Sequence, residues 1–547
     1  MSWSLRATLA LTMTLATPGY PAAAERASSQ TGGATPPPLA EIVARPVPLR
    51  TGIGVAHEVV TTTVPRAQQF YDQGLAYLHS YVWIEAARSF NEALRADPRL
   101  AMAQLGLSYA LGELSDGAGA RAASQRATEL ATGASARERV RIELRARQLV
   151  ASARPTDSAA IGPYRALLDR VTREYPSDVE LLLIVGHAQD GGQHGQGMNG
   201  GSGSLRFYEQ ARALAPDYFA IDHYIAHAYE NLGKPEAALP FARRFTEKAP
   251  KIPHAHHMYG HVLRQVDRMR EAITEFRTAD HLHTAYAEAE RIPLDLDWHY
   301  RHNLDLLATS YQYAGQMANA GALLRRSFET PASGHFGAEQ DIHKRAWPLF
   351  LLGRRRAAEA LTAARTLQSH SSALVQALGH ILASRALQAS GRLEDAAAEG
   401  NAALRQMKSL GPIGGRLVPD LELAQGEYLL RAGQGAQGAT LLRNGVTKLM
   451  SDRSPDAWVA AVFQIEAAAS VALERGQVTL AEELAARLRQ HAPYYPGTHY
   501  LLGVLAEQRG DRPAARAAYR EALLRWRDAD PDLPELKDAK GRVERIK

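Results

Sequence analysis

Two pairs of histidines near the middle of the sequence have the spacing of a metal-binding helix face. His223 and His227 stand in the string HYIAH, and His257 and His261 stand in the string HMYGH. Residues four apart in an α-helix lie on the same side of it, so each pair presents two imidazoles together. The same spacing ligates metal on zinc-binding helices. Twelve of the 20 histidines fall within residues 187–302, so further imidazoles are at hand to complete a site.

The segments that carry these pairs belong to a helical repeat. From residue 67 onward, helix-length segments with apolar residues in helical periodicity alternate with short breaks, and no stretch alternates with the period of a β-strand. One unit has Gly74 midway along its first helix, then Ala86, Phe90 and Ala93 along its second, and ends at Pro98. Small residues let paired helices approach, an aromatic ring fills the gap between hairpins, and proline ends the helix. This pattern predicts an all-α fold.

The pattern resembles the tetratricopeptide repeat, which has a period of about 34 residues and the same small, aromatic and proline landmarks. Similar units occur at Asp217–Pro250, Pro253–Ala279, Ser372–Ala403 and Pro496–Pro531. The resemblance implies a right-handed superhelical α-solenoid of about eleven helical hairpins, because one hairpin cannot bury its apolar face alone and must stack on the next. The first helix of each hairpin would line a concave groove.

The histidine pairs fall in register when the central units are aligned on their turns. His223 and His227 superimpose on His257 and His261, at positions that face the groove in the tetratricopeptide family. Packed helices lie about 8–10 Å apart, so side chains from neighbouring hairpins can share one ion. The residues predicted to lie on one strip of the groove and to ligate metal there are His187, His223, His227, His254, His257, His261, His302 and Asp305.

Three longer strings also resemble a group of exported bacterial tetratricopeptide proteins with the histidine motifs HYxxH, PHAxHMxGH and DWHxxHNLD. They are HYIAHAYENLG, PHAHHMYGHVLRQVDRM and DWHYRHNLDLLATSYQYAGQM. The resemblance implies no activity. We interpret the isolated histidines as structural or surface residues; these are His57, His79, His370, His380, His491 and His499. A second set is interpreted as supporting the strip or as structural, namely His256, His281, His283 and His299.

The choice of metal is limited by the residue types present. The sequence contains no cysteine, which excludes disulfides, thiolate metal sites and attachment of c-type haem. The candidate ions are those that accept imidazole and carboxylate ligands, namely copper, iron or zinc. Two interpretations of the strip need no metal: a polar groove for a peptide, and a pH-sensitive surface.

Other groups beside the strip could take part in chemistry. Three carboxylates fall in or next to it and are candidate acid–base residues: Glu180, Asp190 and Glu230. A glycine-rich segment from Gly191 to Ser204 carries His194 and Met198. We interpret it either as a lid or anion-binding loop over the groove or as a plain insertion. It lacks the lysine of a P-loop and follows no predicted strand, which excludes a nucleotide site.

Charge and hydropathy bound the partners and the location. The 63 basic and 58 acidic residues are spread along the chain, so no basic surface for nucleic acid is expected. Residues 1–24 combine Arg6, a short apolar stretch and a run of alanines, which is typical of a cleaved secretory signal and too short to span a bilayer. We therefore expect a bacterial protein that is periplasmic or secreted and has no membrane span.

The mature chain divides into four predicted parts. Residues 25–66 are expected to form a flexible leader, 67–334 the N-terminal and central repeats with the histidine-rich groove, 335–531 the C-terminal repeats, and 532–547 a capping helix and tail.

Three functions are compatible with these features. The first is a scaffold that binds a protein or peptide in its groove and carries a transition-metal site. The second is a metal-dependent enzyme that uses the histidines, and the third is a protein that sequesters or delivers metal. Three or four ligands beside a pocket would favour catalysis, whereas six or more would favour a structural ion. No nucleophile elbow or HExxH helix occurs, which disfavours hydrolysis by those routes.

Overall fold

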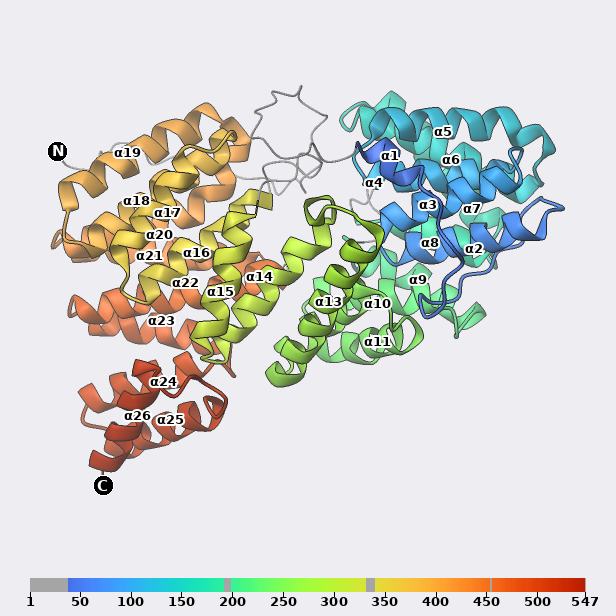
Figure 1. The fold of residues 1–547 in the computed structure, drawn as a ribbon. Coiled ribbons are helices and arrows are strands. Elements are labelled where there is room, and N and C mark those ends of the chain that lie inside the picture. Colours follow the sequence, from blue (N-terminus) through green and yellow to red (C-terminus); the bar gives the residue numbers. More distant parts are fainter. Residues whose placement is uncertain (1–37, 191–197, 331–339, 453–454, 547) are drawn as a thin grey trace. The chain divides into compact units, whose positions relative to one another are not determined.

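A computed structural model of the chain describes residues 38–190, 198–330, 340–452 and 455–546. In these residues the secondary structure consists of 26 α-helices, four short 3₁₀ segments and the turns between them (Figure 1). Helices that follow one another in the sequence pack in pairs. The predicted all-α fold of sequential helical hairpins is therefore confirmed. The expected signal peptide and His194 lie outside the described residues.

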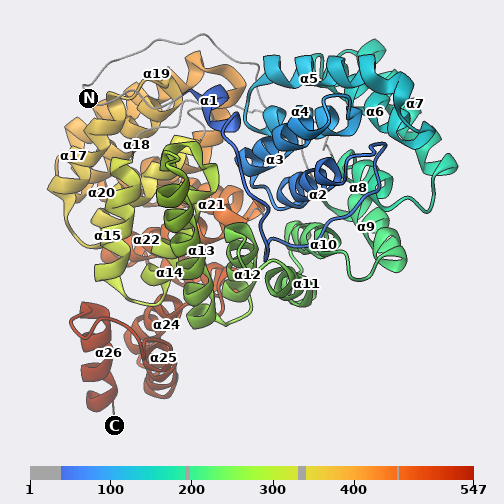
Figure 2. The same ribbon diagram turned by 45° about the vertical axis from the view of Figure 1, so that its right-hand side comes forward.

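The described residues form two compact units, of which the N-terminal one comprises residues 38–190, 198–266 and 274–296. Its helices are α1 (Leu39–Val43), α2 (Pro65–His79), α3 (Trp83–Ala96), α4 (Ala101–Glu113), α5 (Gly117–Leu130), α6 (Ala136–Ala153), α7 (Ser158–Glu174), α8 (Val179–His187), α9 (Ser202–Leu214), α10 (Phe219–Asn231), α11 (Pro235–Lys248), α12 (Pro253–Gln265) and most of α13 (Met269–Glu290). Besides the sequential pairs, α2 contacts α10. Figure 2 shows α2, α8 and α10 side by side.

The C-terminal unit comprises residues 267–273 and the described residues from 297 onward. Its helices are α14 (Trp298–Tyr313), α15 (Met317–Glu329), α16 (Ala346–Gly353), α17 (Ala357–Gln368), α18 (Ala373–Ala389), α19 (Leu393–Ser409), α20 (Val418–Arg431), α21 (Gly435–Ser451), α22 (Pro455–Glu474), α23 (Val478–His491), α24 (Pro496–Gln508), α25 (Arg512–Arg525) and α26 (Pro534–Arg545). The units divide within residues 266–297, whereas the sequence placed the boundary after residue 334.

Helix α22 is the one described helix long and apolar enough to cross a bilayer. Half of its apolar window is buried inside the protein, and Ala461, Val462 and Ile465 are fully buried. The helix contacts α20, α23 and α24 within the C-terminal unit. Its apolar composition is therefore that of a core helix.

The paired helices approach closely where a glycine faces an aromatic ring. Phe90 on α3 is fully buried between Gly74 on α2 and Gly106 on α4. A β-carbon at Gly74 would lie 2.6 Å from the ring of Phe90, and one at Gly106 would lie 2.3 Å from it. Gly260 meets Phe276 in the same way, at 2.7 Å. These contacts confirm the packing role predicted for the small and aromatic landmarks.

The described part of the expected leader, residues 38–66, is packed against the helices. Ile42, Val47 and Ile53 are buried, and the Asn91 side chain donates a hydrogen bond of 2.8 Å to the carbonyl of Val43. The composition of this stretch suggested a flexible chain. The packing corrects that expectation, because the apolar residues spaced along the stretch gain more by burial than the segment gains by staying mobile.

A methyl group at Gly106 tests the close packing of the hairpins. We expect Gly106→Ala to lower the free energy of unfolding by about 1–3 kcal/mol, because the ring of Phe90 must move. Gly162→Ala is the matched control, since Gly162 also lies inside a helix but a β-carbon there meets no atom within 4 Å, so the change should raise stability by about 0.5–1 kcal/mol through helix propensity alone. Chemical unfolding followed by circular dichroism measures both, and equal stability of the two variants would contradict the packing argument.

Candidate metal centre

Three imidazoles from two neighbouring hairpins meet in the N-terminal unit. His223 and His227 lie one turn apart on α10, and His254 lies in the first turn of α12. The Nε2 atom of His254 is 2.9 Å from Nε2 of His223 and 3.4 Å from Nε2 of His227. The potential ligand atoms of these residues, which we call the histidine triad, all lie within 4.8 Å of one another. The structure therefore brings these three of the predicted ligands together.

The protons of the triad are constrained by its surroundings. Nδ1 of His223 donates a hydrogen bond of 2.6 Å to the main-chain carbonyl of His79. A carbonyl can only accept, so the proton of neutral His223 is on Nδ1 and its Nε2 carries a lone pair. Nε2 of His254 lies 2.9 Å from that lone pair, so in the absence of a metal ion it must carry a proton and donate it to Nε2 of His223. The contact between His223 and His254 thus holds one proton, which a metal ion can replace.

Burial lowers the pKa of His223 and of His227 and so favours their neutral form. His223 and His254 are buried, and His227 retains part of its exposure. Burial lowers the pKa of His223 well below its ordinary value, and the neighbouring His227 lowers it further. Burial, with a smaller effect from His261, lowers the pKa of His227 to about 3. Neutral imidazole is the form that ligates metal ions.

Aromatic side chains cover the triad. Tyr81 lies in the turn between α2 and α3 with a φ of 59°, and its ring centroid is 4.5 Å from that of His223 and 4.9 Å from that of His254. The ring of Phe245 stacks on His223 at 4.5 Å. The sequence predicted an open groove at this place. The structure has a covered site instead, because the turn of a hairpin far earlier in the chain lies over it.

The other predicted ligands fall in three places. His257 and His261 are buried on the following turns of α12, with ring centroids 4.5 Å apart. His302 and Asp305 are on α14 in the C-terminal unit, where they line a groove and where Asp305 accepts a hydrogen bond of 2.6 Å from Ser327. His187 ends α8 and is not among the atoms of the histidine triad.

His187 lines a small cavity instead. The cavity has a volume of about 30 Å³, and His79 and Glu180 also line it. Burial lowers the pKa of His187 to about 3, and its ring packs edge-on against Tyr224 at 4.4 Å. Nε2 of His187 is buried and makes no hydrogen bond to the protein. The volume and the polar lining suit water.

The three candidate acid–base residues each make hydrogen bonds to the protein. Glu180 accepts from the Tyr218 hydroxyl at 2.6 Å. Glu230 accepts from Nδ1 of His261 at 3.1 Å. Asp190 accepts from the main-chain nitrogens of Gly201 at 2.8 Å and Ser204 at 2.9 Å, so it ties down the start of α9.

The described end of the glycine-rich segment is held at α10. The Asn231 side chain donates hydrogen bonds to the carbonyls of Met198 and Gly200, at 2.8 and 2.9 Å. Met198 is therefore fixed through its main chain beside the last turn of α10, while its partner in the predicted lid, His194, lies outside the described residues.

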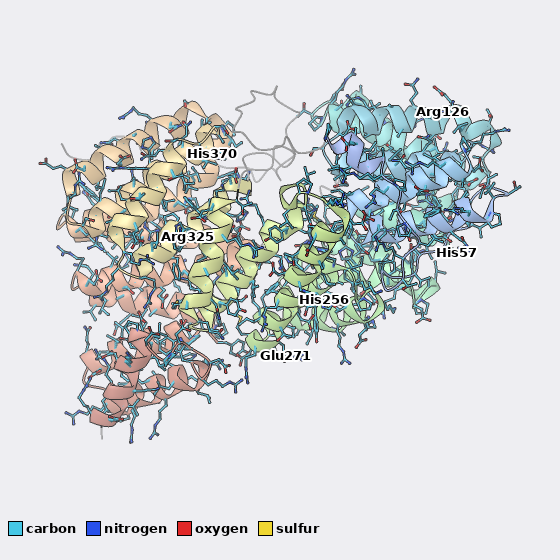
Figure 3. All side chains as sticks on the ribbon, viewed as in Figure 1. His57, Arg126, His256, Glu271, Arg325 and His370 are labelled. Carbon is cyan, nitrogen blue, oxygen red and sulfur yellow. The ribbon has the colours of Figure 1, made fainter. Side chains whose placement is uncertain are left out.

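Several histidines outside the strip pair with carboxylates, as their structural interpretation implied. His57 lies 2.7 Å from Asp72, and His370 lies 3.0 Å from Asp341. His256 on α12 lies 2.6 Å from Glu275 and is not a member of the triad. Figure 3 labels these three histidines. His79 is different, because it contacts the triad directly; nothing local in its sequence marks it out.

Comparisons with known proteins add the general arrangement only. No protein-family model and no curated protein matches the sequence. Among solved structures, the chain is similar to one titled the APC/C hetero-tetramer Cut9-Hcn1, with a TM-score of 0.44 and 11% identity over 88% of this chain and 83% of that one. It is also similar to yeast Tom70, with a TM-score of 0.31 and 11% identity over 88% of this chain and 95% of that one. The all-α repeat fold is established by the packing of sequential helical hairpins in the structure itself.

The buried carboxylate of Glu180 should make the free energy of unfolding depend on pH. Burial would raise the pKa of Glu180, but His79, Arg141 and Tyr218 outweigh it and hold the pKa at about 2. A carboxyl whose pKa is lower in the folded state than in the unfolded chain stabilises the fold above the unfolded value. We expect about 3 kcal/mol of stability to be present at neutral pH and to be lost as the pH falls from about 4.5 towards 2.

Glu180→Gln removes this component. The variant should be less stable than the wild type at pH 7, and the difference should shrink as the pH is lowered through 4.5. Glu129→Gln is the control, because Glu129 pairs with Arg126 on the exposed face of α5 and such pairs contribute little. Unfolding curves at a series of pH values measure both variants. If the difference in unfolding free energy between the wild type and Glu180→Gln stayed constant across that range, folding would not lower the pKa of Glu180, which would contradict the prediction.

Proposed function

We propose that this protein is an exported helical-repeat scaffold whose N-terminal unit holds a transition-metal ion on His223, His227 and His254. The observation that carries the proposal is the convergence of three imidazoles, with all ligand atoms within 4.8 Å. Three protein ligands with a further position to fill is a common composition for metal sites.

The donor set favours copper in its monovalent state. All three ligands are imidazoles, which bind metal in their neutral form, and the nearby carboxylate of Asp222 is held by Arg244 at 2.8 Å and Lys248 at 3.0 Å. An ion bound here brings its full charge into a buried, aromatic-lined place, and the cost of burying a charge rises steeply with its size. A monovalent ion therefore fits better than a divalent one, and among the metals that accept imidazole copper has a stable monovalent form.

The partner-binding part of the proposal belongs to the C-terminal unit. A groove of about 710 Å³ there is lined by the first helices of successive hairpins, which contribute His302, Leu349, Arg385, Glu427, Phe463 and Leu501. Its surface mixes apolar side chains with charged ones, including a buried pair between Arg385 and Glu427 at 2.7 Å. Such a lining suits an extended peptide or a loop of a partner protein.

The alternative of a metal-dependent enzyme rests on the number of ligands. Three ligands leave a coordination position for a substrate. The cavity beside His79 and His187 has room only for molecules of the size of water, so a reaction here would use a very small substrate. The same triad would serve a metal-delivery protein if its ion exchanges with a partner.

Elemental analysis of protein purified without an affinity tag tests the metal centre. We expect the double variant His227→Ala/His254→Ala to contain one equivalent of copper less than the wild type, because two of three ligands are lost. His256→Ala is the control, since His256 is on the same helix but pairs with Glu275. Equal metal content in the wild type and the double variant would contradict the proposal. Zinc or iron in place of copper would keep the centre and overturn the choice of metal.

A further inference from the structure

The C-terminal end of α2 lies against the histidine triad. His79 is the last residue of α2, and its carbonyl accepts the hydrogen bond from Nδ1 of His223. The last carbonyls of a helix have no partner within that helix, so this oxygen is available to a side chain from elsewhere. The end of a helix also carries partial negative charge, which favours a cation nearby. The element that covers the triad thus also orients it.

The side chain of His79 is hydrogen-bonded through Nδ1 and lies close to a carboxylate at Nε2. Nδ1 of His79 is 2.7 Å from the hydroxyl of Tyr224, and Nε2 is 3.3 Å from a carboxylate oxygen of Glu180. His79, Tyr224 and Glu180 are all buried. Rotation of the His79 ring would break both contacts, so the residue that supplies the carbonyl has little freedom to move.

Glu180 and Tyr224 are in turn held in place. The Tyr218 hydroxyl donates to Glu180, and a guanidinium nitrogen of Arg141 lies 3.8 Å from it. The Tyr224 ring stacks on His223 with a centroid distance of 5.0 Å and an interplanar angle of 25°. Tyr224 therefore touches the ligand directly through its ring and indirectly through His79.

We propose that His79, Tyr224 and Glu180 are positioning residues for the metal centre. They hold the last carbonyl of α2 against His223, which keeps the proton of His223 on Nδ1 and aims Nε2 at the ion. This inference rests on the proposed function, because it assigns a role only if the triad binds metal. Partners of this kind behind a metal-bound histidine typically change metal affinity about 10- to 100-fold.

Tyr224→Phe is the sharpest test, because it removes one hydroxyl and leaves the ring stacked on His223. The affinity of the full-length chain for copper(I) is measured by competition with a chromogenic copper(I) chelator under reducing conditions. We expect Tyr224→Phe to bind about 10- to 100-fold more weakly than the wild type. Tyr208→Phe is the matched control, since Tyr208 is equally buried, stacks on Tyr224 at 5.5 Å, and its hydroxyl makes no hydrogen bond to His79. The control should stay within about twofold of the wild type.

A second readout separates positioning from a general loss of stability. X-ray absorption of the copper(I)-loaded protein reports the number and distances of its nitrogen ligands, and we expect these to change in Tyr224→Phe and in Glu180→Gln but not in Tyr208→Phe. An unchanged affinity and spectrum in Tyr224→Phe, with the wild type binding copper(I), would overturn this inference and leave the metal centre standing. A wild type that does not bind copper(I) would overturn both.

Discussion

The central constraint of this site is the close approach of three ring nitrogens in a buried place. One proton lies between the two nearest nitrogens, and the other features of the site follow from this arrangement. These two nitrogens are only 2.9 Å apart, and the proton on the far side of His223 is already committed to the carbonyl of His79. Three features agree with this constraint. Burial favours neutral rings, Tyr81 and Phe245 cover them, and the described ligand group contains no carboxylate. A cation relieves the crowding of lone pairs, and low charge limits the cost of its burial.

The helical hairpins supply the distances that this constraint needs. The contact of Gly260 with Phe276 brings α12 and α13 together, and the register of α10 against α12 lets a side chain from the first turn of one helix meet a pair from the other. The return of α2 to α10 adds what the two hairpins lack, namely a hydrogen-bond acceptor for His223 and a cover over the rings. Metal binding in such a unit therefore depends on packing between elements that are distant in the sequence.

The helical repeat and the core of the triad could be predicted from the sequence, because both are periodic. The spacing of His223 and His227 puts them on one face, and the shared register of the hairpins puts His254 beside them. Other features have no local pattern. The sequence placed His187 on the same strip, but α8 ends at that residue and its ring turns towards Tyr224. His79, treated as an isolated structural residue, reaches the triad across 144 positions of sequence.

Roles of polar residues were harder to predict than their positions. Asp190 was a candidate acid–base group because of its place beside the strip, yet it holds the start of α9 across the glycine-rich segment. The covering of the triad by Tyr81 could not be foreseen either, since it depends on where the turn of an early hairpin comes to lie. Residue type and helical register thus predicted that His223, His227 and His254 could meet. The burial of the triad depends on long-range packing, which has no local pattern in the sequence.

X-ray absorption spectroscopy at the metal edge of the purified protein tests the central claim most directly. The account predicts an edge characteristic of monovalent copper and scattering from about three imidazole nitrogens. An edge of divalent copper in an oxygen-rich environment, or scattering from fewer than two imidazoles, would contradict the assignment of the metal to His223, His227 and His254.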